Sequence, residues 1–406
     1  MNALRIVKAA TLALTLAACV PGAQKPGASD RGPEPRLVFK ASSYSALDGW
    51  NAAGLRDAHA AFQASCRVIS GRAPGEPLGG DKAYGTVGDW HPACLAALAR
   101  AVASESEARS FFETWFHTVQ VFNGSEERGL FTGYYEPELN GSRQKGGRYR
   151  TPLFQRPADL VEVDLGQFRP SLKGERVAGR VVQGRLVPFL PRREIVAGGL
   201  GANGRPLVYV DDAVGAFFLQ IQGSGRIKLD NGEIIRAAYD GQNGHVYTAI
   251  GRILVDRGEI PRETLSMQGI RAWLEGNPDQ ADALMNENAS YVFFREIPIG
   301  DPTKGANGAQ GVPLTAEASL AVDLKFHALG VPMWVDASAP SDVAGAPDAR
   351  YQRLFIAQDT GGAIRGPIRG DVYWGAGARA EHIAGRMAHR GRLFVLLPKP
   401  LASTID

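Results

Sequence analysis

The stretch "QDTGGAIRGPIRGDVYWG", residues 358–375, decides how the C-terminal part of the chain is interpreted. It places Asp359 and Asp371 twelve residues apart (371 − 359), and its five glycines argue against one continuous helix. Asp359 follows the apolar run "LFIAQ" and Asp371 precedes "VYWG", so each carboxylate is expected at the end of a strand. Such carboxyl groups suit acid–base chemistry when burial or a neighbouring carboxylate shifts their pKa. Two aspartates that only cap turns would give the same pattern, and both interpretations stay open here.

The composition of the chain is that of a soluble protein. Its 406 residues are 44% hydrophobic and 21% charged, which leaves room for about two or three domains. The net charge is only +3 and the basic residues are scattered, so no nucleic-acid partner is expected. The seven histidines show no HExxH-like spacing, and no GxSxG motif is present. We therefore expect neither a metal nor an organic cofactor, and no serine acyl transfer.

Residues 1–18 predict an export signal. An apolar run at 9–18 follows two basic residues and is too short to span a bilayer comfortably. Its end, "LAAC", resembles a bacterial lipobox, in which Cys19 is acylated, as with palmitate, and becomes the mature N-terminus. An ordinary signal peptide cut near "GAQ" is the alternative. Val20 is not the aspartate that retains many such lipoproteins at the inner membrane. We therefore expect an outer-membrane lipid anchor facing the periplasm of a Gram-negative bacterium.

A flexible tether is expected at 19–36, which is rich in proline, glycine and charge. Beyond Cys19, only Cys66 and Cys94 remain. In an oxidising compartment this even pair is a candidate disulfide. Two buried free thiols are the alternative.

Helices are expected in the first part of the chain and mainly strands after residue 119. Apolar residues at three- and four-residue spacing predict amphipathic helices at 56–69 and 92–116, separated by the proline-containing linker 73–92. Later, short apolar runs broken by turn residues predict a β-barrel or sandwich. The predicted strands are 129–139, 205–212, 216–229, 232–240, 290–297, 350–359, 370–375 and 391–398. Two further helices are predicted at 244–258 and 264–277.

Four motifs closely resemble those of the membrane-bound lytic transglycosylase A family, bacterial lipoproteins that cut peptidoglycan. The resemblance covers about 37–398, and its C-terminal part is similar to that family's "3D" domain, named for three aspartates. These correspond to Asp323, Asp359 and Asp371. The chain departs from the pattern after Asp323, where "LKFHALGVPMWVDAS" replaces a more usual acidic or polar start. The motifs are "FTGYYEPELNGS" (131–142), "AFFLQIQGSGRIKL" with "YDGQNGHVYTAIG" (216–251), "SYVFFREI" with "GVPLTAEASLAVD" (290–323), and 358–375.

The resemblance implies a mainly β fold with some helices. A double-psi β-barrel domain would be made from 37–137 and 301–406, with a second β-domain inserted at 138–300 and the substrate groove between the two. The strand pattern alone is compatible with this layout but does not produce it.

The resemblance also implies a peptidoglycan lytic transglycosylase. It would cleave the β-1,4 bond between N-acetylmuramic acid and N-acetylglucosamine and leave 1,6-anhydromuramic ends. Asp371 would act first as general acid and then as base. Asp359 would either keep Asp371 protonated or fix its own turn, and Asp323 would be structural. A lysozyme-like muramidase and a noncatalytic peptidoglycan-binding lipoprotein are the alternatives.

The implied partners are peptidoglycan glycan strands and, through the lipid, the outer membrane; a cell-wall synthesis complex is a further candidate. Without the resemblance, "FTGYYEPEL" would be a core strand, "QIQGSG" a tight hairpin and Trp374 either a sugar platform or a core aromatic. The implied substrate-binding residues are Thr132, Tyr134, Tyr135 and Glu136 at the groove wall, and Gln222, Gly223 and Ser224 facing N-acetyl and lactyl groups.

Overall fold

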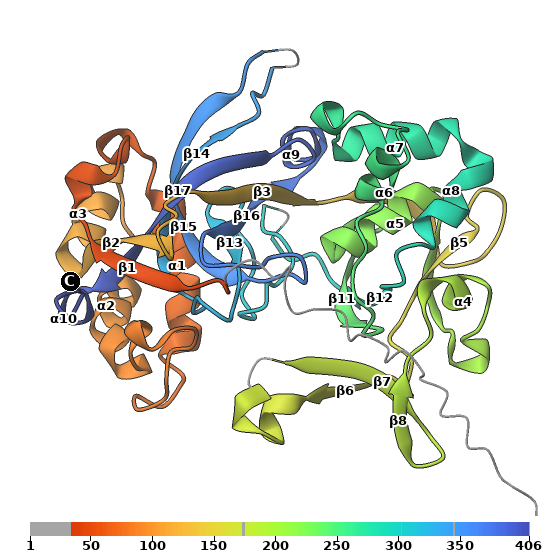
Figure 1. Ribbon diagram of the computed structural model, residues 1–406, viewed down its shortest axis with the longest axis horizontal. Helices are drawn as coiled ribbons and strands as arrows, with labels where there is room; N and C mark the ends of the chain where they lie inside the picture. Colours follow the sequence, from red (N-terminus) through yellow and green to blue (C-terminus); the bar gives the residue numbers. More distant parts are fainter. Residues whose placement is uncertain (1–33, 173–174, 302, 344–345, 406) are drawn as a thin grey trace, which may run out of the picture. The chain divides into compact units, whose positions relative to one another are not determined.

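A closed ring of six strands forms most of the largest sheet in the computed structural model, which describes residues 34–172, 175–301, 303–343 and 346–405 (Figure 1). The ring runs β17, β14, β15, β13, β16, β3, and β3 pairs back onto β17. The pairs β13–β15 and β16–β3 are parallel, whereas the other four are antiparallel. The expected mainly β fold with a barrel is confirmed. The strands are β3 (Gly129–Glu136), β13 (Ser319–Val322), β14 (Pro332–Ala339), β15 (Ala349–Asp359), β16 (Arg369–Ala376) and β17 (Ala388–Pro398).

The barrel is assembled from two distant chain segments, because β3 precedes the other five strands by more than 180 residues. Strand pleating explains how its residues divide between core and surface. In β16, Gly370 and Val372 are buried, while Arg369 and Asp371 between and beside them are partly exposed. Outside the ring, β2 (Phe116–Asn123) pairs with β17, and β1 (Leu37–Ala41) pairs with β2.

Helices of the N- and C-terminal segments pack around this sheet. They are α1 (Arg56–Ile69), α2 (Val87–Ala99), α3 (Glu105–Trp115), α9 (Ala378–Ala384) and α10 (Lys399–Ala402). Cys66 in α1 and Cys94 in α2 are joined by a disulfide. None of the helices in the described ranges has the length and apolar character needed to cross a bilayer.

The predicted single helix at 92–116 is wrong in two respects. Thr86 and Asp89 form a capping box that starts α2 at Val87, so Pro92 lies inside the helix rather than in the linker before it. The helix then ends at Ala99, and Ser104 caps a separate helix, α3, by accepting a hydrogen bond from the amide of Glu107.

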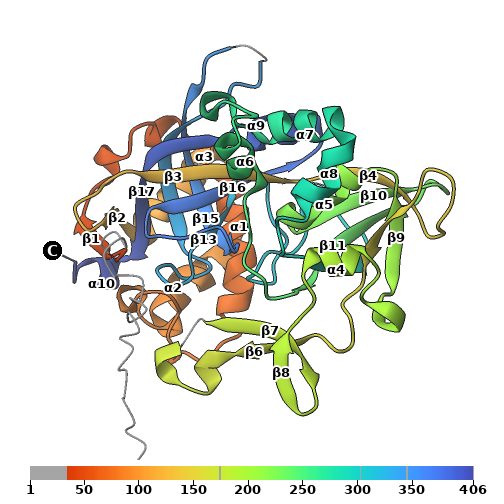
Figure 2. The ribbon, with the colours of Figure 1, turned by 45° about the vertical axis from the view of Figure 1, so that its right-hand side comes forward.

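A second, six-stranded sheet lies between β3 and β13 in sequence, in the order β12, β11, β10, β4, β9, β5. Its apolar side chains form a core cluster of their own. Figure 2 shows helices α5, α6, α7 and α8 gathered beside this sheet. We propose 138–300 as the extent of the inserted domain, because the sheet runs from Glu138 to Ile297. Its strands are β4 (Glu138–Ser142), β5 (Thr151–Phe154), β9 (Pro206–Val210), β10 (Ser224–Leu229), β11 (Ile234–Gln242) and β12 (Val292–Ile297).

The remaining elements of this region are short. A three-stranded sheet contains β6 (Val161–Asp164), β7 (Arg176–Val182) and β8 (Arg185–Pro188). The helices are α4 (Arg192–Val196), α5 (Ala213–Gln222), α6 (Ile250–Asp256), α7 (Met267–Gly276) and α8 (Pro278–Met285).

The predicted strand at 216–229 is wrong over its first half, which forms α5. Asp212 caps the helix by accepting a hydrogen bond from the amide of Gly215, and Gly223 ends it with a φ of +83°. The side chains at 215–220 are all buried, so the helix has no polar face. An apolar run without polar interruption carries no periodicity, and strand and helix then look alike in sequence.

Candidate active site

Asp359 and Asp371 lie on either side of one strand of the barrel. Asp359 ends β15, which pairs in parallel with β13, and Asp371 lies in β16, which pairs antiparallel with β13. Ala321 is the register partner of both aspartates. Because neighbouring strands are about 4.8 Å apart, the two Cα atoms are roughly 10 Å apart. The glycine-rich stretch between them therefore crosses from one edge of β13 to the other. Both carboxyl groups lie at the same height along the barrel, that of Ala321.

Asp371 is held by Thr132, its register partner across the parallel pair of β16 and β3. Thr132 Oγ1 donates a 2.6 Å hydrogen bond to Asp371 Oδ1, and Arg369 Nη2 donates a 2.8 Å bond to the same Oγ1. Burial raises the pKa of Asp371, while Arg369 and the Thr132 bond oppose this shift and Asp359 adds a smaller increase. The residue as a whole is partly exposed, and its carboxyl group retains its proton to a higher pH than an ordinary aspartic acid.

Asp359 accepts three hydrogen bonds. Its Oδ1 accepts from the amides of Ala309 and Thr360, each at 2.9 Å, and its Oδ2 accepts from the Tyr134 hydroxyl at 2.9 Å. Burial raises the pKa of Asp359, and the three hydrogen bonds oppose the shift. These contacts fix the loop after β15 and tie it to the segment around residue 309.

Asp323, the third aspartate of the pattern, lies away from solvent at 3% exposure. Its Oδ2 accepts a 2.8 Å bond from the amide of Gly366 and its Oδ1 a 3.1 Å bond from that of Lys325. Asp323 therefore orders the loops on both sides.

The tyrosines of "FTGYYEPEL" differ in their surroundings. Tyr134 is partly exposed, and its ring centroid lies 5.2 Å from that of Tyr373. Tyr135 is only 4% exposed and belongs to the barrel core. The prediction that Tyr135 binds substrate at the groove wall is therefore wrong, because its side chain is buried in the barrel core.

Glu136 was expected to contact substrate, and the structure places it differently. It has no exposed surface, and its carboxylate is paired with Arg226, at 3.0 Å, and with Arg236. A buried carboxylate with two guanidinium partners is not available to a ligand. Glu136 is the last residue of β3, and its two ion pairs instead connect this strand to β10 and β11 of the second sheet.

Gln222, Gly223 and Ser224 form the junction between α5 and β10 rather than a hairpin. All three are partly exposed. Gln222 Oε1 accepts a 3.0 Å bond from the amide of Tyr135, so this side chain links the junction to β3.

Sequence reasoning missed Arg369 and Tyr373. Each is two residues from Asp371 in β16, so strand alternation places all three on one face. The two-residue spacing from Asp371 was the signal in the sequence that could have identified them.

Trp374 is a core residue with 4% exposure. A Cβ atom on Gly133 would lie 2.6 Å from its Nε1, so the indole packs directly against this glycine.

Residues 130–295 match the model of the MltA specific insert domain, and residues 318–397 match the 3D domain. The membrane-bound lytic murein transglycosylase A of Escherichia coli (strain K12) is 34% identical over 278 residues, covering 68% of this chain and 67% of that protein. The protein of the same name from Vibrio cholerae is 30% identical over 278 residues, covering 67% of each chain.

Solved structures agree with the sequence relatives. The membrane-bound lytic murein transglycosylase from Agrobacterium tumefaciens superimposes with a TM-score of 0.79 at 32% identity, covering 90% of this chain and 99% of that one. MltA from Neisseria gonorrhoeae gives a TM-score of 0.72 at 31% identity, with coverage of 89% and 93%. E. coli MltA with bound chitohexaose gives 0.61 at 27% identity, with coverage of 84% and 90%.

Proposed function

Because the chain belongs to the membrane-bound lytic murein transglycosylase A family, we propose that it cleaves peptidoglycan as a lytic transglycosylase. The bond broken is the β-1,4 link between N-acetylmuramic acid and N-acetylglucosamine, and the new end is 1,6-anhydromuramic acid. The observation that carries this proposal is Asp371, a partly exposed residue whose carboxyl group has a raised pKa and is held in place by Thr132. The names of the curated relatives and the sugar-bound E. coli structure support the substrate class.

In the first step, protonated Asp371 donates its proton to the departing glycosidic oxygen. The anomeric carbon then carries oxocarbenium-like positive charge. The raised pKa keeps the acid loaded before the reaction. Thr132 donates a hydrogen bond to the carboxylate that remains, and the charge of Arg369 favours the same ionised form.

In the second step, the Asp371 carboxylate removes the proton of the sugar's own 6-hydroxyl, which closes on the anomeric carbon. The acid is thereby reloaded and no water is consumed. One carboxyl group is sufficient, whereas most glycoside hydrolases need a second one as base or nucleophile.

Asp359 supports this single-carboxyl scheme. Its two oxygens already accept three hydrogen bonds, from Tyr134, Ala309 and Thr360. Asp359 raises the pKa of Asp371 by less than burial does, and by less than Arg369 and the Thr132 hydrogen bond lower it. We therefore assign Asp359 mainly to the order of the loop and only secondarily to the pKa of Asp371.

Thr132 and Tyr134 are the wall residues that we retain as candidates for substrate contact, together with Gln222, Gly223 and Ser224. All five are partly exposed. Thr132 and Tyr134 also bind the two carboxyl groups directly, so a sugar that reached them would lie next to Asp371.

The protein is further proposed to be an outer-membrane lipoprotein that faces the periplasm, with its lipid on Cys19. Cys19 lies outside the described residues, and the support comes from the "LAAC" pattern and from the membrane-bound description of the relatives.

Analysis of the products tests the function. Digestion of peptidoglycan sacculi should release muropeptides with anhydro ends. Reducing ends would indicate the lysozyme-like muramidase, and no release would indicate a binding lipoprotein.

A further inference from the structure

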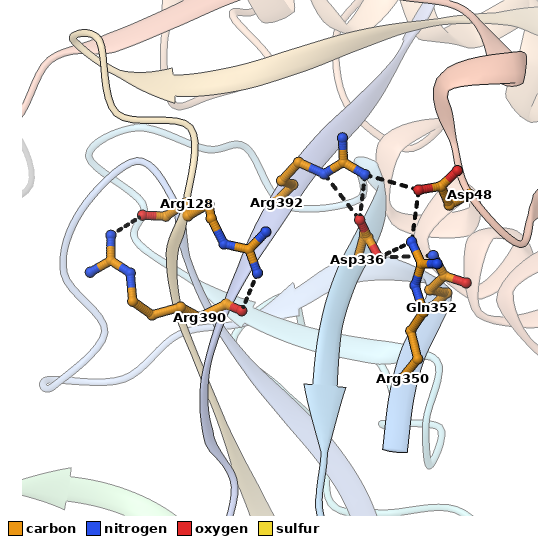
Figure 3. Close-up of polar contacts among 7 residues, drawn as sticks. All are labelled: Asp48, Arg128, Asp336, Arg350, Gln352, Arg390 and Arg392. Carbon is orange, nitrogen blue, oxygen red and sulfur yellow. Dashed lines mark hydrogen bonds and ion pairs between the residues drawn. The ribbon is translucent and has the colours of Figure 1, made fainter. Parts of the chain in front are cut away.

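A pocket of about 330 Å³ lies on the barrel at some distance from the two aspartates. Figure 3 shows the polar side chains around it. It is formed where β14, β15 and β17 adjoin the segment that leads into β3. Its lining residues are Arg128, Asp336, Ala337, Ser338, Arg350 and Arg392.

The carboxylates at one end of the pocket are already paired. Arg392 Nη2 lies 2.6 Å from Asp336 Oδ2 and 3.2 Å from Asp48 Oδ2, and Arg350 Nη2 lies 2.7 Å from Asp48 Oδ2. Gln352 donates a 2.8 Å hydrogen bond to Asp336 Oδ1. Arg350 and Arg392 are therefore held in place by anions of the protein itself.

Arg128, which also lines the pocket, and the neighbouring Arg390 are held by main-chain atoms. Arg128 donates a 3.0 Å bond to the carbonyl of Arg390, and Arg390 donates a 2.6 Å bond to the carbonyl of Arg128 (Figure 3). Within the described part of the chain, Arg128 has no ion-pair partner, and Arg390 has only Glu126 at 3.6 Å, where both side chains are more than 60% exposed. A guanidinium has five N–H donors, so most donors of this pair are left for an external acceptor.

The same two arginines lie in line with Asp371 along the barrel wall. Leu130 is the register partner of both Arg369 in β16 and Arg390 in β17. Leu130 and Thr132 are alternate residues of β3, so their side chains share a face, and Arg128 directly precedes this strand. From Arg128 to Thr132, which binds the Asp371 carboxyl group, four residues of strand span about 13 Å.

We propose that Arg128 and Arg390 bind the carboxylates of the peptide stem on the substrate glycan. This inference rests on the proposed function, because it takes peptidoglycan as the substrate. The stem, attached to the lactyl group of N-acetylmuramic acid, carries free carboxylates, whereas the sugars of the strand are neutral. Planar guanidinium groups form paired hydrogen bonds with carboxylates.

The length of the stem fits the distance. A peptide extends by about 3.3–3.6 Å per residue, so a stem of about four residues reaches roughly 13–14 Å. A sugar bound beside Asp371 can thus place the end of its stem at the arginine pair.

The double variant Arg128→Gln, Arg390→Gln tests the proposal with little risk to the fold. Glutamine retains a donor for the carbonyl contacts, and both arginines are exposed. The control is Arg185→Gln, Arg252→Gln, which removes the same charge from exposed positions in β8 and α6.

The measurement is binding to soluble glycan strands, with and without peptides, in full-length protein carrying Asp371→Asn to prevent turnover. The peptide-free strands are prepared with an amidase, which also frees the lactyl carboxylate of each N-acetylmuramic acid. These strands are therefore charged too, and they differ from the peptide-bearing strands in lacking the stem and its carboxylates. The ratio of the two Kd values isolates the contribution of the stem. The arginine double variant should reduce the preference for peptide-bearing strands by about three- to thirtyfold, as expected for two exposed ion pairs, and the control should not. The preference should also weaken with added salt.

An unchanged ratio in the arginine variant would overturn the proposal. So would a wild-type protein with no preference for peptide-bearing strands. Binding to vesicles of phosphatidylethanolamine and phosphatidylglycerol tests the alternative that the arginine pair binds lipid phosphates rather than stem carboxylates. If the variant lost vesicle binding but kept its preference for stems, the pair would recognise lipid phosphate instead. Failure of the proposed function would show separately, as wild-type protein that releases no anhydro ends from either strand.

Discussion

Thr132 and Asp371 are 239 residues apart in sequence and lie opposite each other in the parallel pair of β3 and β16, joined by a 2.6 Å hydrogen bond. Arg369 donates to the same threonine oxygen. The pKa of the proposed acid is therefore lowered by a residue of β3, the first strand of the barrel. The other five strands of the ring come from the C-terminal part of the chain.

Thr132→Val should shift the high-pH limb of the activity profile upward. The hydrogen bond from Thr132 lowers the pKa of Asp371, so its removal lets that pKa rise further. Because the protonated form is the active acid, activity persists below this pKa and is lost above it. The weaker stabilisation of the carboxylate should reduce kcat by about tenfold.

The control for that change is Thr303→Val. Thr303 donates a similar 2.6 Å bond to the exposed carboxylate of Asp301. Rate profiles from pH 4 to 9 should be unaltered in this variant. A Thr132→Val profile that coincides with wild type would show that Thr132 does not affect the pKa of Asp371.

Asp359→Asn should move the same limb only slightly, and downward. Loss of the negative charge of Asp359 removes a repulsion that raises the pKa of Asp371, but this repulsion raises the pKa less than burial does. The larger effect should be on the loop after β15, seen as faster hydrogen exchange at the amides of Ala309 and Thr360. A limb displaced by about one pH unit or more, equivalent to ~1.4 kcal/mol, would show that Asp359 sets the pKa after all.

Glu136→Gln should destabilise the fold by about 3–5 kcal/mol, because it leaves the buried Arg236 and the partly buried Arg226 beside a neutral group. The control Glu263→Gln, at an exposed position, should have little effect on the thermal midpoint. At a temperature where Glu136→Gln remains folded, KM should be close to that of wild type. A raised KM with normal stability would restore Glu136 to the substrate site.

Cys19→Ala should abolish acylation and release the protein from the outer-membrane fraction, or leave it unprocessed. Fractionation together with mass spectrometry of the N-terminal peptide checks both. Unchanged membrane association, with an unmodified cysteine in the wild-type protein, would contradict the proposed anchor.

The sequence indicated β3, β15, β16 and β17 from their apolar runs, but it did not indicate β14 (Pro332–Ala339) or how the barrel strands pair. Nothing in the local pattern of "FTGYYEPEL" indicates that Thr132 lies opposite Asp371, because that pairing joins segments more than 200 residues apart. The family resemblance supplied the closed barrel. Local signals did fix α1, where three- and four-residue spacing gave its observed bounds of Arg56–Ile69.

Charged residues were harder to place than apolar ones. Glu136 in a row of polar and aromatic residues looks like a ligand contact, and only the tertiary structure brings two arginines from β10 and β11 to it. Arg369 was recognisable in principle from its two-residue spacing to Asp371. Its contact with Thr132, however, depends on the register between β16 and β3.

The central claim is that Asp371 alone performs the acid and base steps that generate anhydro ends. The most direct measurement is the mass and rate of release of muropeptides from sacculi by wild-type protein and by Asp371→Asn, with Asp301→Asn as a control for an exposed, threonine-bonded aspartate. We predict wild-type products one water lighter than those of a hydrolase, a rate at least about 10²-fold lower in Asp371→Asn, and no change in the control. A folded Asp371→Asn protein that releases anhydro ends at close to the wild-type rate would contradict the assignment.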